Sequence, residues 1–113
     1  MNTSRYFHFF LEHHMKTLAL SLLLISSPLW ANKELASKNA CLGCHAVENK
    51  VVGPAYKDVA KKYAGQKDAV AMLAKSIKAG GKGKWGEMAM PAQNQLSEAD
   101  AKTLATWILA GAK

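Results

Sequence analysis

Arginine, cysteine and strand-like stretches are all scarce in this chain of 113 residues. Arg5 is its only arginine, although the chain carries a formal net charge of +7. Because nucleic-acid-binding surfaces rely on arginine as well as lysine, this scarcity argues against nucleic acid as a partner. No stretch alternates apolar and polar residues over the length of a strand, so the sequence does not predict a β fold.

The chain has only two cysteines, and both lie in the stretch Cys41-Leu42-Gly43-Cys44-His45. A structural zinc site takes about four protein ligands, and two cysteines with one histidine fall short of that number. A thioredoxin-like pair needs a βαβ context, which the sequence does not show. Cys-x-x-Cys-His is instead the pattern by which haem is attached covalently, with a structural disulfide as the alternative.

The spacing in this motif suits haem attachment. The two thiols add to the two vinyl groups of the haem, and Gly43 lets the backbone turn so that both sulfurs meet one porphyrin edge. His45 follows directly, so its imidazole reaches the iron with almost no extra loop to order. A carbonyl near Gly53-Pro54 is a candidate acceptor for the other ring N–H of His45, which would fix the tautomer and strengthen the ligand.

The second iron ligand is sought in the glycine-rich segment 80–95. Met88 and Met90 lie there, 43 and 45 residues after His45. A methionine opposite a histidine gives a six-coordinate electron-transfer site, whereas an open position suits gas binding or catalysis. Pro91 stiffens the backbone beside Met90, so Met90 is the favoured ligand and Met88 a wall residue.

The first 31 residues are expected to be a signal peptide preceded by an over-called extension, with the true start at Met15. Lys16 supplies a positive charge, residues 18–25 an apolar run, and Ala31 the expected cleavage point. From Thr17 to Ala31 there are 15 residues, fewer than the roughly 20 that span a bilayer. Export to the periplasm is therefore expected, without a transmembrane anchor in the mature form.

The expected mature domain comprises residues 32–113, with 13 lysines, seven acidic residues and a net charge of +6. Apolar spacing predicts four helices, at 32–39, 54–63, 69–79 and 97–110, in one all-α domain. Pro54 is expected in a first helical turn, and Asp68 and Ser97 as N-caps. In the third helix the predicted inward stripe is Val70, Leu73, Ala74 and Ile77.

Four segments, taken in order, resemble the short bacterial class I cytochromes c: HAVENKVVGPAY (45–56), KDVAKKYAG, KWGEMAMP and ADAKTLATWIL. Those proteins are periplasmic electron carriers of denitrifying and respiring bacteria. The resemblance covers residues 33–113. It implies a compact fold of four to five short helices wrapped around one covalently attached haem c with its iron.

The resemblance also implies a role for each of six residues. They are Cys41 and Cys44 as thioethers, His45 and Met90 as axial iron ligands, Pro54 as the brace of His45, and Trp85 as a donor to a haem propionate. Two departures stand out. At the first, Ser76 occupies a position where some relatives carry an arginine that also meets a propionate. At the second, the run after Met90 is Pro91-Ala92-Gln93-Asn94, where many relatives have two prolines and an asparagine. Either Gln93 or Asn94 is therefore the amide expected at the methionine sulfur.

The expected function is that of a monomeric single-electron carrier rather than an enzyme. Redox partners, reductase or oxidase complexes, would dock transiently at the exposed haem edge. The lysines expected around that edge are Lys50, Lys57, Lys82 and Lys84. The alternative function is a haem enzyme or gas-binding module with an open sixth iron position.

Overall fold

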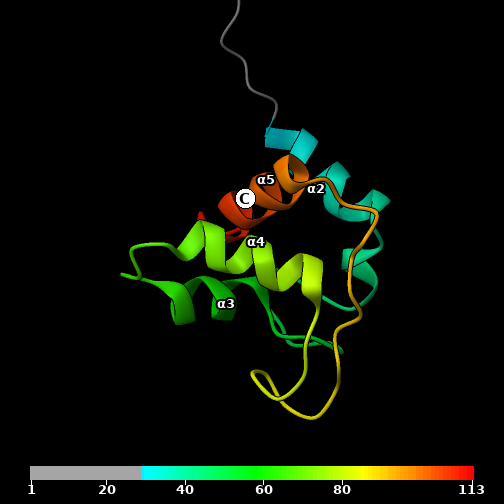
Figure 1. The fold of residues 1–113 in the computed structure, drawn as a ribbon, viewed down its shortest axis with the longest axis vertical. Coiled ribbons are helices and arrows are strands. Elements are labelled where there is room, and N and C mark those ends of the chain that lie inside the picture. Colours follow the sequence, from blue (N-terminus) through cyan, green and yellow to red (C-terminus); the bar gives the residue numbers. More distant parts are fainter. Residues whose placement is uncertain (1–28) are drawn as a thin grey trace, which may run out of the picture.

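The computed structural model describes residues 29–113, in which three α-helices pack around a fourth, the last one (Figure 1). The elements are α2 (Leu29–Lys38), a 3₁₀ turn η1 (Cys41–Gly43), α3 (Tyr56–Tyr63), α4 (Ala69–Ala79) and α5 (Glu98–Leu109). Within this part of the chain the only β pairings are two isolated bridges. The all-α prediction is therefore confirmed. The expected start at Met15 and the apolar run 18–25 lie outside the described residues.

Helix α5 forms the centre of the packing and contacts α2, α3 and α4. It buries Leu104, which is 1% exposed, together with its neighbours one turn along, Ala101 and Ile108. Its start is capped as predicted, because Ser97 Oγ accepts a hydrogen bond of 3.0 Å from the Asp100 backbone N–H. Helix α5 thus begins at a defined residue and packs its apolar face against the other three helices.

Helices α3 and α4 cover one side of α5, and their buried residues follow the predicted helical spacing. In α4 the buried residues are Leu73, Ala74 and Ile77. The prediction for Val70 was wrong, since it is 37% exposed. Val70 lies in the first turn of α4, where the apolar pattern does not reflect full burial.

Two helix starts and one helix cap differ from the sequence prediction. Helix α2 begins at Leu29 instead of residue 32, so the expected cleavage point after Ala31 falls inside the helix. Pro54 precedes α3, because Ala55 is the extended N-cap residue and helical geometry begins only at Tyr56. Asp68 occupies the N-cap position of α4 but makes no capping bond, since its backbone (φ −108°, ψ 30°) lacks the extended conformation that capping requires.

The segment between α4 and α5 forms an irregular hairpin that extends away from the helices and then returns (Figure 1). At its base Gly81 and Met90 exchange two backbone hydrogen bonds of 3.0 and 2.8 Å. Near its tip the Gly83 N–H donates to the Gly86 carbonyl at 3.0 Å. Among the described residues no helix is long and apolar enough to cross a membrane.

Candidate haem site

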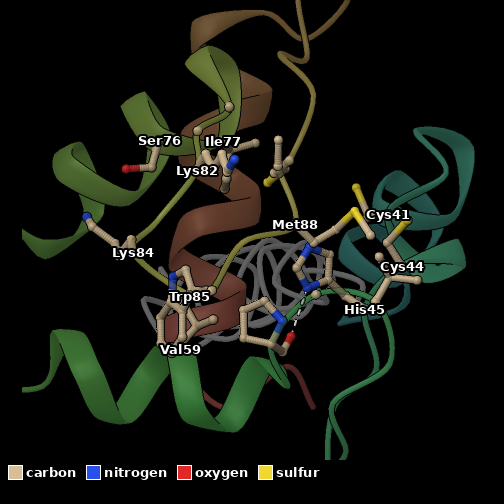
Figure 2. A pocket seen from close by; sticks show the side chains of 18 of the residues that line it. Cys41, Cys44, His45, Val59, Ser76, Ile77, Lys82, Lys84, Trp85 and Met88 are labelled. Atoms are coloured by element: carbon tan, nitrogen blue, oxygen red, sulfur yellow. Dashed lines mark hydrogen bonds between the residues drawn. The ribbon is translucent and has the colours of Figure 1, made fainter.

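A cavity of about 410 Å³ lies between the Cys-x-x-Cys-His segment, the helices and the hairpin. Figure 2 shows Cys41, Cys44 and His45 on one side of it, and Val59 and Trp85 on the other. Helices α3, α4 and α5 supply an apolar wall made of Tyr56, Val59, Leu73, Ile77, Leu104 and Ile108. The volume of the cavity lies within the range of about 300–1,000 Å³ that is usual for cofactor sites.

His45 is held from three directions. Its Nδ1 lies 2.8 Å from the Pro54 carbonyl oxygen, as the sequence predicted for this region. With Nδ1–H as the donor, Nε2 is the nitrogen left free to bind a metal. Tyr56 stacks on the imidazole with ring centroids 5.3 Å apart, and Gly53 lies so close that a Cβ there would be 2.8 Å from Nδ1. The ring is therefore fixed by the protein alone.

Cys41 is the first residue of the 3₁₀ turn and Cys44 is its C-cap, and both are free thiols. The Cys44 and His45 backbone N–H groups donate to the Cys41 carbonyl, at 3.1 and 2.9 Å. Burial, as the largest effect, raises the pKa of the Cys41 thiol. Gly43 has an ordinary backbone conformation with open space around its Cα, so the turn formed by the protein does not itself require glycine there. Two thiols on one turn are what covalent attachment of a haem requires.

Met90 lines the same cavity from the base of the hairpin. Gly80 makes this position possible, because its φ of 67° and ψ of −165° suit glycine almost exclusively. A Cβ at Gly80 would also collide with the Met90 carbonyl oxygen and lie 2.7 Å from the Ala92 nitrogen. Met88 lines the cavity too, but it is 70% exposed. Of the two methionines, Met90 is the one that the backbone holds in place.

The amides after Met90 form a short hydrogen-bonded chain. Gln95 Nε2 donates to Gln93 Oε1 at 2.7 Å and to Asn39 Oδ1 at 3.3 Å, and Gln93 Nε2 donates to the Pro91 carbonyl at 3.0 Å. The Gln93 backbone N–H donates to the Lys78 carbonyl at 2.9 Å. The amide chain, Asn39–Gln95–Gln93–Pro91, therefore links the end of α2, just before Cys41, to the segment just after Met90.

Sequence reasoning found the ligand candidates but missed the residues that position them. The sequence placed a carbonyl acceptor near Gly53 and counted Gly80 only in the glycine-rich segment, but it did not show that each glycine lies directly against a candidate ligand or its backbone. The stacking of Tyr56 on His45 was also missed. A glycine eight residues after the histidine and followed by proline was the one available signal for the Gly53 contact.

No cluster of three or more histidine, cysteine, aspartate or glutamate side chains lies in residues 29–113, so the described part of the chain offers no conventional zinc site. Two free thiols, an imidazole with Nε2 available and a thioether instead line one largely apolar cavity. This donor set fits haem c. In an all-helical fold it defines the class of small proteins that carry one covalently attached haem.

Comparison with known proteins agrees with this class. The family model for cytochrome c matches residues 31–112. Cytochrome c-552 of Nitrosomonas europaea is 53% identical over 93 residues, covering 82% of this chain and 90% of that protein. Cytochrome c-551 of Pseudomonas aeruginosa is 49% identical over 102 residues, covering 84% and 97%.

Solved structures show the same relationship. The crystal structure of Nitrosomonas europaea cytochrome c552 has a TM-score of 0.67 and 55% identity, covering 69% of this chain and 96% of that one. Class 1 cytochrome MtoD from Sideroxydans lithotrophicus has a TM-score of 0.62 and 34% identity, covering 74% and 95%. The chain belongs to the cytochrome c family. It is an electron carrier with one covalently attached haem c and its iron, and not an enzyme or a gas-binding module.

Proposed function

We propose that His45 and Met90 are the two axial iron ligands and that Cys41 and Cys44 form the thioether bonds. The observation that carries this assignment is that all four residues line one cavity, with His45 held by Pro54 and Met90 held by Gly81. The bound haem c supplies a one-electron couple between ferric and ferrous iron. Ligands that stay in place in both states keep the atomic rearrangement small.

The protein contributes a dry and rigid surrounding for this couple. The helical wall of the cavity excludes water from most of the porphyrin, which disfavours the extra positive charge of the oxidised form and raises the potential. Trp85 lines the cavity opposite the cysteines, where its indole N–H is proposed to donate to a propionate. Pro54 keeps the His45 proton on Nδ1 and thereby makes Nε2 the better ligand.

We further propose that the carrier works in the periplasm after removal of residues 1–31. Three observations support export: the charge at Lys16, the apolar run 18–25, and a haem-attachment motif in the remaining domain. The family is one of small bacterial carriers, and the described helices offer no membrane span.

The docking surface for redox partners is proposed to surround the open side of the cavity. Lys50, Lys82 and Lys84 line it there, and exposed Val52 and Met88 add apolar area. Of the four lysines expected at this edge, Lys57 is outside the lining and pairs with Glu48 at 3.3 Å. A small patch of mixed lysine and apolar character suits the weak and fast encounters of electron-transfer proteins.

A mass and a visible spectrum of periplasmic material test these assignments together. The mass reports the cleavage point and covalent haem, and the reduced spectrum reports low-spin c-type bands. Material without haem mass would contradict the thioether assignment, and a mature chain starting elsewhere than residue 32 would contradict the cleavage site.

Met90→Ala tests the sixth ligand, with Met88→Ala as its matched control. The Met90 variant is expected to lose the far-red ferric band that iron–thioether ligation produces, to have a lower potential and to bind carbon monoxide rapidly when reduced. The Met88 variant is expected to retain the band and to resist carbon monoxide, because its side chain is largely exposed. If Met90→Ala leaves band and potential unchanged, the ligand assignment is wrong.

A further inference from the structure

The tip of the hairpin is tied to α3 by two lysines. Lys62 Nζ, on α3, donates to the Lys84 carbonyl at 2.9 Å and lies 4.3 Å from the centroid of the Trp85 ring. Lys84 Nζ, on the hairpin, donates in return to Tyr63 Oη on α3 at 2.9 Å. The two ammonium groups thus cross between the same two segments in opposite directions.

These contacts differ from ordinary surface lysine contacts in what they hold. Tyr63 is only 3% exposed and lines the cavity, so the Lys84 ammonium lies against the cavity wall. Burial by itself would raise the pKa of Tyr63, but hydrogen bonds from Lys84 and Ser76 and the charges of Lys84 and Lys62 outweigh it and lower that pKa. Both lysines therefore act electrostatically on a group inside the site.

The contacts also bear on the ligand loop. Trp85 lies at the tip of the hairpin and Met90 at its base, where Gly81 pairs with it. Figure 2 shows Ser76, Lys84 and Trp85 on the side of the cavity away from Cys41 and Cys44. Anything that fixes the tip on α3 therefore fixes the indole at the cavity and steadies the segment that carries Met90.

We infer that Lys62 and Lys84 are positioning residues that clamp the hairpin tip onto α3, hold the Trp85 indole at the cavity and place two positive charges at that end of the site. This lysine clamp rests on the proposed function, because its effect is on the iron potential. It supplies positive charge on the side of the cavity where Ser76, at the position of an arginine in some relatives, provides none.

The sign of the effect follows from electrostatics. The oxidised site carries one more positive charge than the reduced site, so a nearby cation favours reduction and raises the potential. With an effective dielectric constant of about 20, and allowing for screening by water and salt, removing one such charge should change the one-electron equilibrium constant by roughly threefold to tenfold. A tenfold change corresponds to about 59 mV for one electron.

Four variants of the haem-loaded protein separate charge from position. Lys84→Gln is expected to lower the midpoint potential and to shift the Trp85 indole N–H resonance. Lys62→Gln should do the same through loss of the contact with the ring. Lys84→Arg keeps both charge and donor and should restore the wild-type values, while Tyr63→Phe keeps the charge and should shift mainly the indole resonance.

Lys61→Gln is the matched control. Lys61 is the exposed neighbour of Lys62 on α3, and its side chain makes no hydrogen bond or ion pair with the described residues. If Lys84→Gln and Lys62→Gln shift the potential and the indole resonance no more than Lys61→Gln does, the clamp is wrong. The far-red ferric band separates the two levels of inference. If the wild type lacks this band, the proposed ligation is wrong and the clamp with it. If Lys84→Gln and Lys62→Gln retain the band and have the same potential as Lys61→Gln, the clamp alone is wrong.

Discussion

The two sides of the haem cavity are built in different ways. The cysteine side, residues 41–54, is a single short segment in which the turn, the ligand and the acceptor for the ligand's proton follow one another within 14 residues. The methionine side, residues 80–91, is a hairpin whose position depends on α4, α3 and, through the amide chain, on the end of α2. One side is local and the other is assembled from distant parts.

This difference has a consequence for how each ligand responds to damage. The imidazole on the cysteine side is confined by Gly53 and Pro54 of the same segment and by Tyr56 at the start of α3, so a change there disturbs the ring directly. On the methionine side a change disturbs the path of the hairpin and leaves the covalent attachment intact. Ligand loss should therefore be possible on the methionine side without loss of haem.

Gly53→Ala is expected to have the largest effect, because a Cβ there collides with a rigid aromatic ring and not with a flexible side chain. The imidazole must move and weaken its bond to Pro54, and overpacking of this kind typically costs about 1–3 kcal/mol. Denaturant unfolding of the haem-loaded protein measures the loss, and the yield of attached haem should fall with it. Gly43→Ala is the control within the same segment, since open space surrounds that Cα. Equal stability of the two variants would contradict the confinement of His45.

Gly80→Ala is expected to loosen Met90 while His45 and the haem stay in place. The new Cβ would meet the backbone of residues 90–92, and a backbone with φ of 67° and ψ of −165° strains any residue other than glycine by about 1–3 kcal/mol. The far-red ferric band should weaken and carbon monoxide binding should become faster. Gly65→Ala controls for positive φ alone, because Gly65 (φ 76°) has nothing within 4 Å of a Cβ. A Gly80 variant with a full band would show that the close approach does not hold the ligand.

The sequence predicts the cysteine side better than the methionine side for the same physical reason. Cys-x-x-Cys-His, the carbonyl contact of His45 near Gly53-Pro54 and the Ser97 cap all depend on residues close together in the chain, and the structure contains the contact and the cap as expected. The clamp from Lys62 to Trp85 joins residues 23 positions apart, and no periodicity reports such a contact. The prediction for Val70 was wrong for a related reason, since an apolar stripe does not say which of its positions the distant segments will cover.

Gln95→Ala is expected to have a smaller effect, on the link between the methionine side and the end of α2. It removes the middle of the amide chain that joins Asn39 to Gln93 and so to the Pro91 carbonyl. These bonds are exposed, so the loss of stability should not exceed the roughly 0.5–1.5 kcal/mol that a typical hydrogen bond contributes. Hydrogen exchange at the Gln93 backbone N–H, which donates to the Lys78 carbonyl, should become faster.

Gln66→Ala provides the comparison for Gln95→Ala. Gln66 is also an exposed amide, but its Nε2 donates only to the Lys62 carbonyl near the end of α3. Its removal should leave exchange at the Gln93 amide unchanged. If both variants change that exchange equally, the amide chain does not join the two sides.

Glu98→Gln is expected to have the smallest effect and to depend on pH. Glu98 is fully exposed and pairs with Lys78 at 2.8 Å, and the hydrogen bond and charge of Lys78 lower the pKa of Glu98. A carboxyl group with a lowered pKa in the folded state adds stability above its unfolded pKa, near 4.3, and that stability is lost as the pH falls through the folded value. The unfolding temperature of the variant should thus be slightly lower than that of the wild type at pH 7. The two should be equal at pH values below the folded and the unfolded pKa of Glu98. Asp100→Asn is the control, because it removes an equal charge from the same turn of α5 and does not involve the ion pair with Lys78. If the stability difference of Glu98→Gln persists in acid, or if Asp100→Asn reproduces it in full, the effect belongs to the charge at the helix end. It would then not come from the Lys78–Glu98 pair that joins α4 to α5.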